Sequence, residues 1–181
     1  MDCRVRVGNF KWFGGVLAPN GLIYGIPSHH SSVLIIDPTD NSADITTMSG
    51  LGALPYKWNG AALANNGMIY ASPRDSDRVL IIDPSTNTAD NTTIAGSSAL
   101  RESSNKWFCN VVLGDNRVLA VPLQGTAALV IDPATNVVDT ITIAAIPPGT
   151  LNWGGCVLGD DGAVYAVPSH SSSVLVIGTH C

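Results

Sequence analysis

Short apolar runs alternate along the chain with clusters of Gly, Pro, Asn and Asp. In the first unit "WFGGVLA" leads to a turn at Pro19 to Gly21, "LIYGI" ends at Pro27, and "SVLIID" ends at an Asp-Pro-Thr turn. Asn and Gly tolerate the positive φ of tight hairpins, and Asp-Pro favours a type I turn. A last run, "ADITTM", alternates polar and apolar residues as a half-exposed strand does. The pattern predicts four short antiparallel strands, and no segment has the 3.6-residue period of an amphipathic helix.

This pattern occurs four times in constant register. The tryptophans that open the units are 46, 49 and 46 residues apart, and the prolines that end the second runs have the same spacings. They are Trp12, Trp58, Trp107 and Trp153, with Pro27, Pro73, Pro122 and Pro168. An Ile-Asp-Pro tripeptide closes the third run in the first three copies, whereas the fourth copy reads Ile177-Gly178. Self-similarity at this period is the signature of a repeat architecture.

Four antiparallel strands in a unit of about 46 residues is the length of a β-propeller blade. The motif "NGxIYxxP" followed by "VLIIDPxTN" resembles the blades of the Kelch, NHL and YVTN group of propellers. We therefore predict an all-β fold, a four-bladed β-propeller forming one domain over residues 1–181, with blades starting near residues 11, 57, 106 and 152. An open array or a β-sandwich is the alternative, and the strict register argues against the sandwich.

The fourth copy supplies only three strand-like runs, and "CRVRVGN" precedes the first tryptophan where a fourth run is expected. In the propellers that the repeat resembles, an N-terminal strand completes the last blade. The resemblance implies that residues 1–10 close the ring in this way, which removes a free sheet edge. Alternatively, the chain is half of a larger ring that a second copy completes, so both a monomer and a homodimer remain open.

The four cysteines show no CxxC spacing, so a zinc site built on them is not expected. Cys3 and Cys181 would lie at the open ends of one blade, and a disulfide between them would resemble the closure of hemopexin-type propellers; two free thiols are the alternative. Cys109 and Cys156 follow the tryptophans of the third and fourth innermost runs. There we expect small buried residues that allow close approach near the axis.

Charge and motifs exclude several functions. The formal net charge is −5 and no basic run occurs, which argues against nucleic acid or an anionic membrane as a partner. No apolar stretch has the length of a membrane helix, and no apolar core follows the charged start as in a secretory signal. The nucleophile, zinc-protease and phosphate-loop motifs are absent, so no cofactor and no catalytic residue is predicted.

The loops at one end of the predicted ring vary most between copies, as recognition loops on a constant scaffold do. Two residues after each recurring proline lie His29, Asp75, Gln124 and His170, our first candidate ligand-binding residues. In a closed ring His29 and His170 would face each other and, with Asp75, could hold a metal. The alternative is that they are solvated loop residues, and no metal site is predicted.

Lysine precedes the tryptophan in three copies: Lys11, Lys57 and Lys106. Together they could attract an anionic ligand at the channel mouth, or their stems could pack on aromatic rings. The tryptophans themselves either fill the wedges between blades or stack on sugars. We therefore expect a binding module for an unidentified small molecule, glycan or protein. A lectin-like propeller is the alternative, followed by an enzyme with a metal or polar site at the channel mouth.

Overall fold

The computed structural model describes residues 8–101, 104–142 and 151–178, and within them the strands follow the repeat. Blade 1 contains β1 (Trp12–Leu17), β2 (Ile23–Pro27), β3 (Leu34–Asp37) and β4 (Ser42–Asp44). Blade 2 contains β5 (Trp58–Leu63), β6 (Ile69–Pro73), β7 (Leu80–Asp83) and β8 (Thr88–Asp90). Blade 3 contains β9 (Trp107–Val112), β10 (Val118–Pro122), β11 (Ala127–Asp132) and β12 (Val137–Thr142), and blade 4 contains β13 (Trp153–Leu158), β14 (Val164–Pro168) and β15 (Leu175–Ile177).

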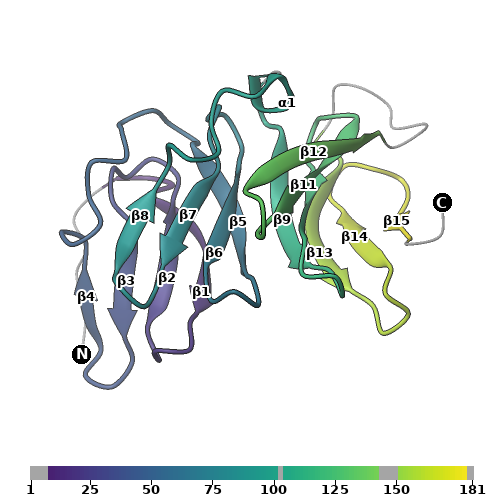
Figure 1. Cartoon of the computed structure of the whole chain (residues 1–181). Helices are drawn as coiled ribbons and strands as arrows, with labels where there is room; N and C mark the ends of the chain where they lie inside the picture. The colour runs from purple at the N-terminus through teal and green to yellow at the C-terminus, as the bar shows by residue number, and fades with distance from the viewer. Residues whose placement is uncertain (1–7, 102–103, 143–150, 179–181) are drawn as a thin grey trace.

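Each blade is one antiparallel sheet with its strands in sequence order, and the four sheets lie around one central axis. The innermost strands pack in succession, β1 against β5, β5 against β9 and β9 against β13 (Figure 1). The predicted fold class, an all-β four-bladed β-propeller, is confirmed. The closing strand was predicted within residues 1–10. Residues 1–7 lie outside the described residues and residues 8–10 are not part of a strand, so that strand stays a prediction.

The tryptophan that opens each blade is a structural clamp. Its indole Nε1 donates to a backbone carbonyl twenty residues further along the chain, at or just before the start of the third strand, at 2.6–3.1 Å in all four blades. Trp58, Trp107 and Trp153 are buried and Trp12 is half-buried. Trp58, Trp107 and Trp153 therefore pack between blades, the first of the two alternatives, because a buried ring with a satisfied N–H is not available to stack on a sugar.

Three seams of one design join consecutive blades. The face of a blade that carries the second-strand tyrosine or its equivalent packs on the tryptophan face of the next blade. At the first seam Tyr24 and Ile26 join Trp58 and Leu80 in one buried cluster, and the other two seams repeat this arrangement. A backbone hydrogen bond crosses each seam at the loop end, from the residue before the tryptophan to the residue after the proline, at 2.8–3.1 Å: Lys57 to Ser28, Lys106 to Arg74, and Asn152 to Leu123.

Two features differ from the sequence-based expectation. Cys109 and Cys156 form a disulfide that ties β9 to β13, with 5.7 Å between their Cα atoms. Their expected role as small residues allowing close approach is thus corrected, since consecutive inner strands bring the two thiols to adjacent positions. Cys3 and Cys181 lie outside the described residues, and their pairing stays a prediction. A one-turn helix, α1 (Ser98–Arg101), lies between blades 2 and 3 and is too short to produce a helical period.

Within the described residues no helix is both long and apolar enough to cross a bilayer.

Candidate functional site at the loop end of the ring

The loops after the second strands hold the four predicted ligand-binding residues in equivalent positions. The backbone N–H groups of His29, Asp75, Gln124 and His170 each donate to the carbonyl of the residue two places before the blade's tryptophan, at 3.0–3.2 Å. Those acceptors are Phe10, Tyr56, Asn105 and Leu151. The repeat therefore places one candidate residue per blade at the same end of the molecule, which is the upper end in Figure 1.

Aromatic side chains gather at this end around the innermost strand of blade 1. Phe10 lies 5.8–6.1 Å from the ring centroids of Phe13, His29 and Tyr56, and His29 meets Tyr56 edge-on at 4.3 Å. Phe13 also meets Phe108 of blade 3 edge-on at 5.8 Å. We call these five residues the aromatic mouth. Phe10 is 53% exposed, so the cluster presents an apolar ring to solvent.

The backbone of the aromatic mouth is strained. Phe10 and Tyr56 both have a φ of 52°, in the left-handed region that bulky residues avoid. Asn105, at the equivalent position in blade 3, has a φ of 57°, but asparagine tolerates this conformation. Strain of this kind is concentrated at binding sites, where the surrounding structure holds residues in unfavourable conformations.

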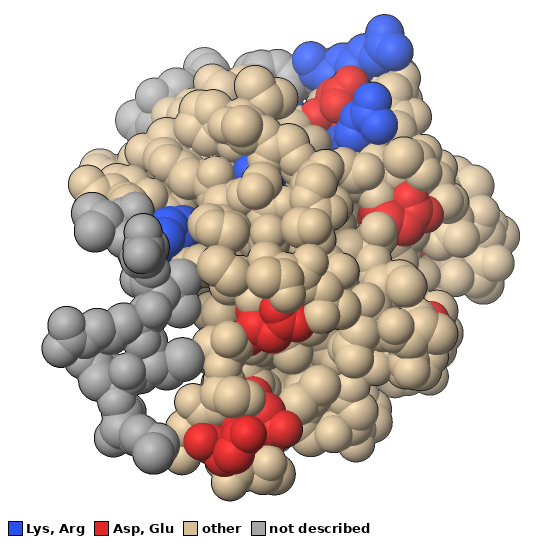
Figure 2. Space-filling model, turned by 90° about the vertical axis from the view of Figure 1, so that its left-hand side faces the viewer, with Lys and Arg blue, Asp and Glu red and all other residues tan. Residues whose placement is uncertain are grey.

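A polar edge adjoins the aromatic mouth. The Arg74 guanidinium lies 4.2 Å from the centroid of the Tyr56 ring, and its Nε donates to Asn105 Oδ1 at 2.7 Å. The Asn105 backbone N–H donates to Asp75 Oδ1 at 2.6 Å, and its Nδ2 donates to Gln124 Oε1 at 3.3 Å. Asp75 and Gln124 are thereby brought together through Asn105. Figure 2 shows basic side chains in the upper part of one side of the molecule, with acidic side chains both beside them and further down.

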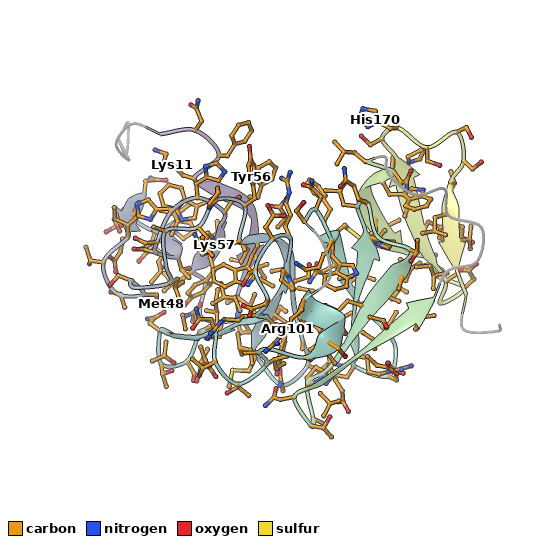
Figure 3. The ribbon with its side chains drawn as sticks, turned by 90° about the horizontal axis from the view of Figure 1, so that it is seen from above. Lys11, Met48, Tyr56, Lys57, Arg101 and His170 are labelled. Carbon is orange, nitrogen blue, oxygen red and sulfur yellow. A yellow bond between two sulfur atoms is a disulfide. The ribbon has the colours of Figure 1, made fainter. Side chains whose placement is uncertain are left out.

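The two candidate histidines have different surroundings. His29 is enclosed by Phe10 and Tyr56, and its Nε2 is buried without a hydrogen-bond partner. His170 Nδ1 instead contacts the Leu151 carbonyl at 3.1 Å in blade 4, and Figure 3 shows it on the far side of the ring from Tyr56. Among the described residues no three His, Cys, Asp or Glu side chains are grouped as metal ligands.

Two of the three lysines that precede the tryptophans are buried. Lys57 is buried, and its ammonium donates to three carbonyls, those of Ser28, His30 and Leu54, at 2.9–3.1 Å. Burial lowers the pKa of Lys57 to about 8. Lys106 is also buried, and desolvation likewise lowers its pKa.

The ammonium groups of Lys11, Lys57 and Lys106 lie 5.5–6.0 Å from the rings of the neighbouring tryptophans. This geometry fits the alternative in which the lysine stems pack on aromatic rings. Lys57 in particular has all three ammonium donors engaged, which leaves none for an anion.

Beside the rings of Phe13 and Phe108 the innermost strands line an open cavity of about 200 Å³. Its lining comes from all four blades and consists largely of glycines and the rings of Phe13 and Phe108; the other lining residues are Gly14, Gly15, Gly60, Ala61, Cys109, Asn110, Gly154 and Gly155. Asn110 is fixed there by Ser72, whose hydroxyl donates to its Oδ1 at 2.7 Å. The cavity extends the mouth into the ring.

Sequence reasoning missed six members of this site: Phe10, Phe13, Tyr56, Arg74, Asn105 and Phe108. A usable signal was present, because Phe10, Tyr56 and Asn105 occupy the same repeat position, one residue before the lysine. The lysine and the tryptophan recur between copies, whereas the residue before the lysine varies. The repeat pattern therefore does not mark that residue as functional.

No protein-family model and no curated protein sequence matches the chain. Solved structures do match its fold. Virginiamycin B lyase from Staphylococcus aureus superposes with a TM-score of 0.69 at 9% identity, over 93% of this chain and 53% of that one. Hydrazine synthase from Kuenenia stuttgartiensis superposes with a TM-score of 0.66 at 16% identity, and the match covers 96% of this chain and 47% of that protein's chain. An auxiliary nutrient binding protein from Bacteroides ovatus superposes with a TM-score of 0.61 at 13% identity, and the match covers 91% of this chain and 44% of that protein's chain.

The chain thus spans about half the length of these proteins. Similarity at this level of identity establishes a β-propeller fold, and it does not distinguish Kelch, NHL and YVTN blades.

Proposed function

We propose that the protein is a binding module and that its ligand site is the aromatic mouth together with the polar edge formed by Arg74, Asn105 and Gln124. The ligand class that fits is a small molecule with a flat ring and polar substituents. The observation that carries the proposal is the exposed Phe10 ring on a cluster of four further aromatic side chains, at the opening of the ring.

An exposed aromatic ring on a rigid platform is suited to stacking on a ligand ring. Aromatic pairs contribute roughly 0.5–1.5 kcal/mol beyond the area they bury. The left-handed backbone at Phe10 and Tyr56 supports the same role, since it holds both rings in place at the cost of local stability.

The polar groups beside the platform would set the orientation of the ligand. The His29 Nε2 atom is buried and has no hydrogen-bond partner, and a buried polar atom of this kind costs about 1–3 kcal/mol unless a ligand satisfies it. The Arg74 guanidinium lies against the Tyr56 ring and the Gln124 amide contacts Asn105, and both side chains carry donors for polar substituents.

The alternatives have less support. A lectin with one tryptophan site per blade would need exposed tryptophans, whereas three of the four are buried here. The neighbours include a lyase and a nutrient-binding protein, so the fold serves both catalysis and binding, and function has to be argued from the site. The aromatic mouth presents ring faces and fixed polar groups, which favours binding.

The proposal is tested by screening a library of ring-containing fragments, monosaccharides included, by two-dimensional NMR of the labelled chain. We expect binders to shift signals of Tyr56, Arg74 and Gln124. Replacing Phe10 by Ala should weaken the best binder about tenfold, because stacking on one ring is worth roughly 1 kcal/mol or slightly more.

Leu17→Ala is the matched control. Leu17 is 63% exposed and lies at the other end of β1, so this variant removes a similar exposed apolar side chain outside the site and should bind as the native chain does. Binders that shift only signals outside the mouth, or that bind the Phe10→Ala variant unchanged, would contradict the proposal.

A further inference from the structure

Blade 4 exposes the apolar face that the other three blades bury. In blades 1–3 the residues of this face pack on the next blade, and those of blade 1 that do so are Val16, Ile26, Val33 and Ile35. Their equivalents in blade 4 are uncovered valines, each 53–57% exposed: Val157, Val167, Val174 and Val176. Four exposed valines on one face of a blade form an apolar surface of the kind that marks an interaction site.

Blade 1 carries the complementary surface. The tryptophan faces of blades 2 and 3 are buried in seams, and the turn prolines Pro84 and Pro133 are buried with them. On blade 1 the equivalent residues are only half-buried, and Pro38 is exposed. Among the described strands, no seam comparable to the other three joins β13 to β1. The chain therefore presents both halves of a seam at its two ends.

We propose that blade 4 of one copy docks on blade 1 of a second copy through a fourth seam of the same design. The partner is a second copy of this chain, because the surface complementary to blade 4 is present on blade 1. Three seams within the chain show that a tyrosine face packs on a tryptophan face. Two copies related by a two-fold axis form this seam twice and close a ring, which leaves neither surface exposed.

A specific hydrogen bond is expected at the new seam. Within the chain, Tyr24 Oη donates to Asn87 Oδ1 at 2.6 Å, and Asn87 belongs to the turn after the third strand of the next blade. Tyr165, the equivalent of Tyr24, donates to Asp161 Oδ2 at 2.7 Å within its own blade. Asn41 is the blade 1 equivalent of Asn87 and has the same left-handed backbone. The Asn41 amide of the second copy can therefore donate to Tyr165 Oη.

The test measures molecular mass in solution by light scattering or sedimentation, over a range of concentrations. We expect the native chain to have twice the mass of one chain, and the Val174→Lys variant to have the mass of one chain. A lysine at Val174 would place an unpaired charge inside an apolar seam. Pro38→Lys blocks the other half of the seam and should have the same effect; because Pro38 is exposed, this variant serves even where Val174→Lys folds poorly.

Val137→Lys is the matched control, since Val137 is 59% exposed on β12 of blade 3 and belongs to no seam. It should keep the doubled mass. Mixing the Val174→Lys and Pro38→Lys variants should restore a species of doubled mass, because one of the two seams then contains only native surfaces. A native chain that stays monomeric at every concentration overturns the proposal. So do open polymers in place of a closed pair, and so does loss of the doubled mass in Val137→Lys.

Discussion

Gly60 lies where two inner strands approach most closely. Its φ is +67°, and the register between β5 and β6 shifts between Trp58 and Ala61. A Cβ placed on Gly60 would overlap the carbonyl oxygen of Phe108 in the next blade. The position therefore demands glycine for two separate reasons, a left-handed backbone and the absence of space.

Comparison with Gly67 separates these reasons. Gly67 has a φ of +83°, but no atom lies within 4 Å of the place that a Cβ would take, so Gly67→Ala carries only the backbone cost of about 1–2 kcal/mol. Gly60→Ala should be less stable by a further 1–3 kcal/mol or so, because β5 and β9 must also move apart. Urea denaturation of both variants measures the difference. Equal free energies of unfolding would contradict the close approach.

At the scale of the element, aspartates organise the turns and the short strands that follow them. Asp44, at the end of β4, accepts hydrogen bonds from Thr47 and Thr46, and Asp90 does the same with Thr93 and Thr92 at the end of β8. These bonds, that of Thr47 first, lower the pKa of Asp44 to about 2. The last run of each unit was predicted as a simple alternating strand. In blades 1 and 2 this strand has only three residues, and it ends where the aspartate side chain accepts hydrogen bonds from the following threonines.

The low pKa of Asp44 makes the stability of the protein pH-dependent. Since the pKa in the folded state lies below the ordinary value of 3.8, the carboxylate stabilises the fold above about pH 4, and this contribution is lost as the pH falls towards 2. Thr47→Val should reduce the free energy of unfolding at pH 7 by about 0.5–1 kcal/mol, and by less at pH 2.

Urea denaturation at pH 7, 4 and 2 measures this effect. Thr93→Val should behave in the same way, because Asp90 is the blade 2 equivalent of Asp44. An unchanged pH dependence in both variants would show that these bonds do not stabilise the fold.

The elements were largely predictable, and the site was not. Turn chemistry and apolar periodicity are local, so the strand ends at Pro27 and Asp37 could be read directly from the sequence. The aromatic mouth depends on contacts between distant residues, such as Phe13 with Phe108, and on a left-handed backbone at Tyr56 that no local preference indicates. The buried position of Lys57 likewise depends on three carbonyls from the preceding loops.

At the scale of the whole molecule, a disulfide secures the last blade. Blades 1 and 4 each have one seam within the described chain, whereas blades 2 and 3 each have two, so the bond between Cys109 and Cys156 ties a terminal blade to the neighbour on which it packs. The sequence contained both cysteines at adjacent positions of consecutive inner strands. Only the packing of β13 on β9 shows that they meet.

Replacing both Cys109 and Cys156 by Ser should destabilise the protein by about 4 kcal/mol, since the bond closes a loop with a sequence separation of 47 residues. Urea denaturation of the native and double-variant proteins measures the loss. Equal free energies of unfolding would contradict it. A remaining effect of reductant on the double variant would reveal a second disulfide, as predicted for Cys3 with Cys181.

The indole clamp has a consequence for biosynthesis. Because every tryptophan finds its carbonyl partner twenty residues later, the contact that defines a blade is short-range in sequence and is repeated four times. Contacts of this kind form early, with little loop entropy to overcome. Each blade can therefore begin to assemble while the ribosome is still translating the following one, and the nascent chain does not have to wait for its C-terminus.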